Sequence, residues 1–463
     1  MSHSSQSDYE PFRVLLFRNK TSDLLLETTA EGLCLPALTV PKHSRIAQEI
    51  TAAIEDQWSV TAYCLFSLPS DLNSPELDCY QIAEVCQSCA APPAGMKWFA
   101  AATLTSTEFA ERADFEAIQA SVTTLDLYRR SELQGCFGKP GWLQVVMEWV
   151  EVQAAHAGLR LTGKFRQLNA CPTFSLLRFE TDGPALWFKA VGEPNLQEYG
   201  ITLGLAQLSP AYLPRVIASN RDWNAWLSVE AEGQHLTEKS PIDSWQNVAA
   251  ALANLQITSF GNCLHLIELG CKDLRASSLL ERVDPFFDYL TELMKAQTKQ
   301  APAPLTPSEI TALAGEVRKA LEELSESEVP NVLGHRDCNP GNIMVSRERC
   351  VFLDWAEGCV GHPFFTLQYL LEHWRKFNGG DHSGGEAILS AYTAPWKSFF
   401  PLRHMTADLS PIPLAAAFAC AAGGSVLSAT VVRPETAAFL RSITRRMKRE
   451  ADAWRQGRLA CVR

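Results

Sequence analysis

Three side chains that could carry out chemistry lie close together between Leu333 and Phe365, in the stretch LGHRDCNPGNIMVSRERCVFLDWAEGCVGHPFF. Asp337 follows His335, Asn342 comes five positions after Asp337, and Asp354 comes twelve positions after Asn342. A carboxylate and an amide oxygen are suitable ligands for a hard cation such as Mg²⁺. A second, separately held aspartate could accept a proton from an attacking hydroxyl.

The segment between Asn342 and Asp354 predicts the element that positions them. Residues 343–345 and 351–353 are short apolar runs separated by the polar residues 346–349, a pattern typical of a β-hairpin. A hairpin of this size brings its two ends together, so Asn342 and Asp354 should lie side by side with Asp337 just before them. A cation held at two oxygen ligands and a separate base match the requirements of phosphoryl transfer.

This stretch resembles the catalytic core of the aminoglycoside phosphotransferase and choline kinase-like enzymes. These enzymes are relatives of the protein kinases and phosphorylate small molecules. The resemblance rests on the pattern His335-x-Asp337-x₄-Asn342 and on Leu353-Asp354-Trp355. It implies a catalytic loop with His335 and with Asp337 as the base, Asn342 and Asp354 as Mg²⁺ ligands, and ATP as the phosphate donor. The four matching positions make an unrelated set of polar loop residues the weaker interpretation.

Two positions depart from that family pattern. Arg336 stands where the small-molecule members usually carry glycine. Protein kinases carry arginine at the corresponding position. The family often has an acidic residue shortly after the Gly-x-Pro turn, where this chain has Phe365-Thr366. Neither departure affects the three chemical positions.

Composition indicates a globular chain of several domains. The 463 residues are too many for one ordinary domain, and 46% hydrophobic residues with 20% charged residues supply ample core. A formal net charge of -11 disfavours nucleic acid as a partner. Fourteen cysteines and no recognisable signal peptide predict a reducing cytoplasm, and no run predicts a membrane span. The sequence does not indicate an oligomeric state.

Residues 1–130 predict a separate α+β accessory domain. Its order of hairpin, helix near residues 44–57, further strands and a helix around residues 106–123 is similar to the Nudix hydrolase fold. By that resemblance the family's paired metal-binding glutamates would fall on Ala52 and Ala53. Alanine cannot hold a cation, so the resemblance predicts an inactive domain with an accessory or interaction role.

Residues 131–232 predict the small sheet lobe of a kinase, preceded by a connector helix over residues 141–158. Three strands follow, at residues 161–167, 175–180 and 185–190, and Lys189 ends the third. A lysine at a strand end is usually a solvated edge residue. Here the resemblance favours an ion pair with Glu198 that orients nucleotide phosphates, and Glu193 is the competing acid.

Two further segments of this lobe are candidates for nucleotide contacts. The loop at residues 168–175 lacks glycine. Thr173 or Ser175 could contact the phosphates, and an ordinary solvated turn is an equal alternative. Residues 226–233 resemble the linker between the two kinase lobes, where backbone groups near Val229 and Ala231 would contact the adenine.

The remaining residues, 233–463, predict a helical lobe that carries the chemistry. One helix should begin at the capping box Thr306-Pro-Ser-Glu309 and bury the apolar stripe that follows it. The predicted fold is α+β, a protein-kinase-like bilobal fold with a separate α+β domain before it, and ATP with Mg²⁺ would lie between the two lobes.

We therefore expect an ATP- and Mg²⁺-dependent phosphotransferase that acts on a hydroxyl of an aminoglycoside-, choline- or sugar-like small molecule. Two alternatives come from other classes: a silent pseudokinase that binds a ligand or partner, and a phosphohydrolase of the first domain. The intact motif disfavours the first, and Ala52 and Ala53 disfavour the second. The acceptor itself cannot be deduced, because acceptor pockets are built from residues scattered in the sequence.

Overall fold

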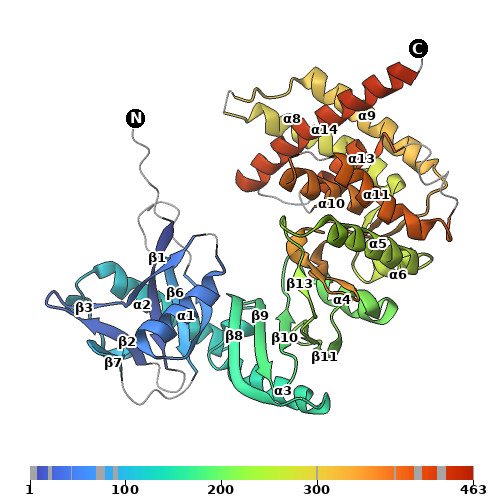
Figure 1. Ribbon diagram of the computed structural model, residues 1–463. Coiled ribbons are helices and arrows are strands. Elements are labelled where there is room, and N and C mark those ends of the chain that lie inside the picture. Colours follow the sequence, from blue (N-terminus) through green and yellow to red (C-terminus); the bar gives the residue numbers. More distant parts are fainter. Residues whose placement is uncertain are drawn as a thin grey trace. The chain divides into compact units, whose positions relative to one another are not determined.

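The computed structural model describes residues 8–18, 23–42, 44–68, 79–86, 92–298, 301–379, 382–400, 409–424 and 434–461. The chain divides into two compact units (Figure 1). Unit 1 comprises residues 1–199 and 215–230, and unit 2 comprises residues 200–214 and 231–463. Both units combine helices and sheets, so the predicted α+β class is confirmed. Among the described residues, no helix is both long enough and apolar enough to cross a membrane.

Unit 1 begins with a seven-stranded mixed sheet in which β1 and β6 pair in parallel. Alternate residues of β1 face opposite sides: Val14 and Leu16 pack with helix α1, whereas Leu15 and Phe17 pack in the core that contains α2 and α3. The strands of this sheet are β1 (Tyr9–Phe17), β2 (Asp23–Thr28), β3 (Leu33–Cys34), β4 (Ala37–Pro41), β5 (Ala62–Ser67), β6 (Cys79–Val85) and β7 (Met96–Ala100), and its helices are α1 (Ile46–Trp58), α2 (Arg112–Arg129) and α3 (Trp142–His156).

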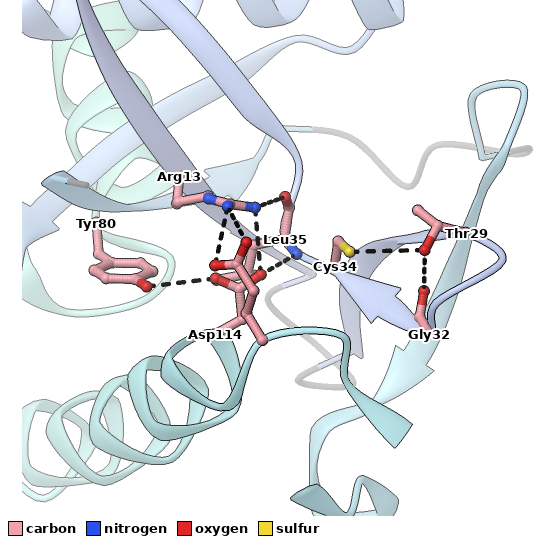
Figure 2. A network of polar contacts seen from close by, with 8 residues as sticks. Arg13, Thr29, Gly32, Cys34, Leu35, Tyr80 and Asp114 are labelled. Carbon is pink, nitrogen blue, oxygen red and sulfur yellow. Dashed lines mark hydrogen bonds and ion pairs between the residues drawn. The ribbon is translucent and has the colours of Figure 1, made fainter. Parts of the chain in front are cut away.

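A buried ion pair joins α2 to this sheet. Figure 2 shows the Arg13 guanidinium directed at the Asp114 carboxylate, with the Tyr80 hydroxyl on the other side of that carboxylate. Asp114 is fully buried and also accepts a hydrogen bond from the Leu35 amide at 2.8 Å. Burial raises the pKa of Asp114, and the donors around it oppose that shift. The group is saturated with partners and serves to fix α2 on the strands.

The second sheet of unit 1 is entirely antiparallel and follows α3. Its strand order is β11-β12-β10-β9-β8, so β8 is an edge strand. The ring of Trp149 on α3 packs edge-on against Phe188 and Trp223 and covers one face of this sheet. Its strands are β8 (Leu161–Cys171), β9 (Phe174–Thr181), β10 (Leu186–Ala190), β11 (Val216–Asn220) and β12 (Ala225–Val229), and α4 (Gln197–Leu208) follows β10.

Unit 2 is mainly helical and holds two small three-stranded sheets. In one, β16 (Ile343–Val345) is the central strand between β13 (Gln234–His235) and β17 (Cys350–Phe352); in the other, β18 (Gly358–Gly361) is the central strand between β14 (Lys272–Leu274) and β15 (Val332–His335). The capping box at Thr306 begins α9, and its apolar stripe is buried as predicted. The helices are α5 (Ile242–Ser259), α6 (Cys263–Glu268), α7 (Ala276–Leu280), α8 (Val283–Lys295), α9 (Pro307–Ser325), α10 (Phe364–Phe377), α11 (His382–Trp396), α13 (Ile412–Ala422) and α14 (Pro434–Cys461).

Candidate active site

The hairpin predicted from the sequence is present as β16 and β17. Ile343 pairs with Phe352, and the Leu353 amide donates to the Asn342 carbonyl at 2.8 Å. The hydrogen-bond ladder therefore continues one pair past the strands, to Asn342 and Leu353. Asn342 ends one arm, and Asp354 comes directly after its partner on the other arm.

The Asp337 carboxylate is held by two amide side chains. Asn342 Nδ2 donates to Asp337 Oδ2 at 3.0 Å, and Asn339 Nδ2 donates to Asp337 Oδ1 at 2.9 Å. The Tyr369 hydroxyl, from α10, donates to the same Oδ1 at 3.4 Å. Because both oxygens accept a hydrogen bond, the carboxylate is fixed in one orientation. Asn339 and Tyr369 were not among the residues predicted from the sequence.

The His335 ring is a buried bridge between the two arms of the site. It is 1% exposed, its Nδ1 accepts from the Asp337 amide at 3.2 Å, and its Nε2 contacts the Leu353 carbonyl at 2.9 Å. This arrangement requires the tautomer that carries hydrogen on Nε2. Burial lowers the pKa of His335, so the neutral form is favoured. The ring therefore positions the loop and has no access to a substrate.

The backbone of Asp354 is strained. Its φ of 61° and ψ of 69° lie in the left-handed region, which residues other than glycine seldom adopt. The residue is exposed, whereas Leu353 before it is partly buried and Trp355 after it is buried. Strain of this kind is concentrated at functional sites, where neighbouring packing maintains it. Here the strained residue is exposed and lies between the buried strand β17 and the buried Trp355.

The donor set at the hairpin ends fits Mg²⁺. The side chain of Asn342 uses its Nδ2 to donate to Asp337, so its side-chain oxygen Oδ1 is the atom that could bind a cation, and Asp354 adds a carboxylate. Mg²⁺ is commonly held by one or two protein oxygens and completed by substrate phosphates and water. In the described parts of the chain, no group of three or more His, Cys, Asp or Glu side chains could hold a metal ion.

The Arg336 side chain ties the loop that carries Asp337 to distant elements. Its Nη1 donates to Glu357 Oε2 at 2.5 Å and to the Gly423 carbonyl at 2.9 Å, and its Nη2 donates to the Cys420 carbonyl at 2.9 Å. Both carbonyls belong to the C-terminal end of α13, whose unpaired carbonyls favour a cation. The departure from the family glycine thus has a structural role in this chain.

A small cavity lies beside the catalytic loop. Its volume of about 40 Å³ suits one or two water molecules and not a whole acceptor. Glu372 and Arg446 form an ion pair in its wall, and burial raises the pKa of Glu372. Tyr369, which contacts Asp337, also lines it. The cavity is lined by Leu274, His335, Arg336, Cys359, Phe365, Thr366, Tyr369, Glu372, Ala416, Ala419, Cys420 and Arg446.

In unit 1, Lys189 and Glu198 lie in direct contact. Lys189 Nζ donates to Glu198 Oε1 at 2.5 Å, and Glu198 is 1% exposed. The Lys189 ammonium also lies 5.7 Å from the Trp226 ring centroid. Glu193, the competing acid, is exposed. A buried carboxylate beside a partly exposed lysine fixes the lysine head, as an ion pair that orients phosphates requires.

The other residues predicted to contact the nucleotide, Ser175, Val229 and Ala231, lack a charged side chain like that of Lys189. Ser175 is fully buried, and its hydroxyl has no hydrogen-bond partner among the described residues. The Val229 amide donates to the Arg215 carbonyl at 2.9 Å, and Ala231 is partly exposed. Between them, Glu230 accepts from Arg178 at 2.6 Å and from Trp187 at 3.1 Å, which fixes the start of the linker. The adenine and phosphate roles of Val229, Ala231 and Ser175 remain predictions.

Asp337 is held in one orientation, and Asn342 and Asp354 lie at the two ends of the neighbouring hairpin. This arrangement is suited to phosphoryl transfer. Residues 196–395 match the model of the phosphotransferase enzyme family. The match contains all four residues of the catalytic stretch and confirms the resemblance predicted from the sequence. No curated protein matches the chain.

Several solved structures are similar to this chain at low identity. A macrolide 2'-phosphotransferase from Brachybacterium faecium is 20% identical with a TM-score of 0.41, covering 63% of this chain and 97% of that one. A choline kinase from Cryptosporidium parvum is 12% identical with a TM-score of 0.46, covering 68% of this chain and 96% of that one. The choline kinase LicA from Streptococcus pneumoniae is 13% identical with a TM-score of 0.43, covering 65% of this chain and 98% of that one.

Proposed function

We propose that this chain transfers the γ-phosphoryl group of ATP to a hydroxyl of a small molecule, with Mg²⁺. The observation that carries the proposal is the hydrogen bond from Asn342 Nδ2 to Asp337 Oδ2. That bond joins the candidate base to a candidate cation ligand, and Asp354 lies beside the same hairpin end. The family match over residues 196–395 supports the same activity.

Asp337 would orient the acceptor hydroxyl and accept its proton. The hydroxyl oxygen attacks the γ-phosphorus, the bond from that phosphorus to the bridging oxygen breaks, and ADP leaves. Because the Asp337 carboxylate accepts from Asn339 and Asn342, its orientation is set before the acceptor arrives. In this type of transfer most of the acceleration comes from positioning and charge stabilisation.

The remaining residues would bind the donor. Lys189, fixed by Glu198, would contact donor phosphates. Asn342 and Asp354 would hold Mg²⁺, which when bound neutralises the charge of the phosphates. The acceptor is a hydroxyl-bearing small molecule, and the aminoglycoside, choline-like and sugar classes are the candidates to test.

Nucleotide binding and product detection test the proposal together. ATP is titrated with and without Mg²⁺, and ADP formation is then measured against a panel of aminoglycosides, amino alcohols and sugars. We expect Mg²⁺-dependent ATP binding and phosphorylation of at least one hydroxyl compound, lost in Asp337→Asn. Mg²⁺-dependent binding without transfer to any compound would instead favour the pseudokinase alternative.

A further inference from the structure

The turn between β8 and β9 is held from two sides by glycines. The Phe137 amide donates to the Pro172 carbonyl at 3.0 Å. Gly135, with a φ of +105°, lies so close that an added Cβ would be 2.3 Å from that carbonyl oxygen. On the other side, a Cβ on Gly192 would be 2.4 Å from Thr173 Cβ. The turn is therefore clamped, in contrast to a mobile glycine-rich loop.

The segment that holds this turn, residues 135–141, is itself fixed to the first sheet. The Gly141 amide donates to Glu84 Oε2 at 2.8 Å, and the Tyr63 hydroxyl donates to the same oxygen at 2.5 Å. Glu84 is 1% exposed and Tyr63 is 3% exposed. A buried carboxylate that loses such donors is costly, so these bonds define one position for the segment. We call residues 135–141 the connector.

Aromatic packing fixes the middle of the connector. The Phe137 ring packs edge-on against Trp142 and against Phe188, with centroids 5.2 Å and 6.1 Å away. Trp142 in turn packs edge-on against Tyr63 of the first sheet, and Phe188 precedes Lys189 in β10. Phe137 is 3% exposed, so it fills the space between the two sheets. The contacts run without a break from β5 to the strand that carries Lys189.

A second polar contact joins the two sheets directly. The Gln167 side chain of β8 accepts from the Cys64 amide at 2.7 Å and donates to the Cys64 carbonyl at 2.9 Å. Gln167 is 1% exposed. Its side-chain amide bonds both backbone groups of Cys64, as a residue of a neighbouring strand would do. It does so at the outer edge of β5, which is the last strand of its sheet. The two sheets are thus joined at both an edge and a connector.

We propose that the first sheet domain is a positioning element of the donor nucleotide site and acts through the connector on the β8–β9 turn. The proposal rests on the proposed function, because it takes this turn as the phosphate-contacting segment. A clamped turn would present Thr173 and the turn backbone to the phosphates in one conformation, which removes the ordering cost that a flexible loop incurs on binding. Phe137 and Gly135 are then positioning residues for ATP and do not contact the acceptor.

The test compares Gly135→Ala with Gly163→Ala in the full chain. Both glycines have positive φ, of +105° and +85°, so both substitutions strain the backbone. A Cβ at Gly163 meets nothing within 4 Å, whereas at Gly135 it collides with the Pro172 carbonyl. Gly163 lies in β8 itself and is exposed. The pair therefore separates loss of the clamp from simple glycine strain.

We expect Gly135→Ala to weaken Mg²⁺-ATP binding about tenfold, since the hydrogen bond to Pro172 and the order of the turn are lost together. The KM for the acceptor should change less than twofold, and Gly163→Ala should bind ATP like the parent. Equal ATP affinity in Gly135→Ala and the parent, or equal weakening in both variants, would overturn the proposal. Amide hydrogen exchange should rise at residues 171–174 in Gly135→Ala alone.

If Gly135→Ala does not fold, Glu84→Met provides the same comparison from the other end of the connector. It keeps a side chain of similar length but removes the acceptor of the Gly141 and Tyr63 hydrogen bonds, so it should raise amide exchange at residues 171–174 and weaken ATP binding; unchanged exchange and affinity would overturn the proposal. A parent chain that binds Mg²⁺-ATP but transfers no phosphate would contradict the proposed function, while the affinity comparison would still decide the role of the connector.

Discussion

Replacing Asp337 by Asn tests the base assignment, and the structure predicts how the site responds. The carboxylate accepts from Asn339 on Oδ1 and from Asn342 on Oδ2. An Asn side chain keeps one oxygen and places an NH₂ group at the other position. That NH₂ group must face one of the two amide donors, so one neighbour has to rotate its amide by half a turn.

Asn339 is the neighbour that rotates at lower cost. Its other contact, to the Asp337 carbonyl, is 3.4 Å long, whereas Asn342 donates to that carbonyl at 3.0 Å and holds the hairpin end. With Asn342 unchanged, its oxygen stays available to Mg²⁺. ATP affinity should therefore stay within about threefold of the parent, and the loss of two charge-assisted bonds should lower the unfolding free energy by about 1–2 kcal/mol.

The transfer rate should fall by about 10² to 10⁴, because the variant cannot accept the hydroxyl proton. At 1.36 kcal/mol for each tenfold, this corresponds to roughly 3–5 kcal/mol of transition-state stabilisation. ADP release in the presence of the identified acceptor measures the rate, and titration measures ATP affinity. Transfer at the parent rate would remove Asp337 from the role of base.

A swapped pair is the matched control. In the double variant Asp337→Asn, Asn339→Asp, the new amide at the first position can donate to the new carboxylate at the second, which restores the pairing of donor and acceptor. Thermal stability should return towards that of the parent, while the rate stays low because the carboxylate is in the wrong place. Recovery of the rate in this double variant would show that the position of the carboxylate is not specific, contrary to the assignment.

Three further outcomes follow from the geometry. Asp354→Asn keeps a side chain that tolerates the left-handed backbone but loses the charge, so turnover and the Mg²⁺ dependence of ATP binding should both fall by at least tenfold; unchanged metal dependence would exclude Asp354 as a ligand. Ala52 and Ala53, exposed and partly buried in α1, stand where the Nudix resemblance places metal-binding glutamates. The full chain carrying Asp337→Asn should therefore not hydrolyse nucleoside diphosphate derivatives with Mg²⁺. Product formation would show that this alignment with the Nudix helix is wrong. Burial raises the pKa of Glu84, so the folded state binds that proton more tightly than the unfolded state does, and the unfolding free energy falls as pH rises from about 4 towards the raised pKa. Chemical denaturation at several pH values should show a smaller fall in Glu84→Gln than in the parent. The same dependence of the unfolding free energy on pH in both proteins would contradict this.

The catalytic stretch could be predicted because its geometry is local. A hairpin whose two arms are close in sequence determines where its ends lie, so Asn342 and Asp354 could be paired from spacing alone. Asn339 left a signal that was missed, since an amide two residues after an aspartate often bonds back to it. Tyr369 left none, because it reaches Asp337 from a helix whose packing no local pattern specifies.

The contacts that join the two sheets of unit 1 could not be predicted either, because they also depend on packing between segments that are distant in sequence. Glu84 and Gln167 are polar residues at buried positions of strands, which by itself indicates a buried partner. Their partners, Gly141 and Cys64, are distant in sequence and are determined only by how the sheets pack. The predicted division at residues 130 and 232 stays a prediction, and both sheets lie within one compact unit.

Arg336 shows why a motif departure has to be judged in three dimensions. By sequence it suggested only a likeness to protein kinases, with no partner that could be named. In the structure its side chain satisfies two carbonyls at the end of α13 and pairs with Glu357, just after Asp354. A glycine here would leave those two carbonyls without this donor in a partly buried place, and Glu357 would keep only the longer contact with Lys272, at 3.4 Å, of the two cationic partners it has here. The loop that carries Asp337 is thus held by the hairpin on one side and by a helix end on the other, and a chain with glycine at this position would need a different support for the same aspartate.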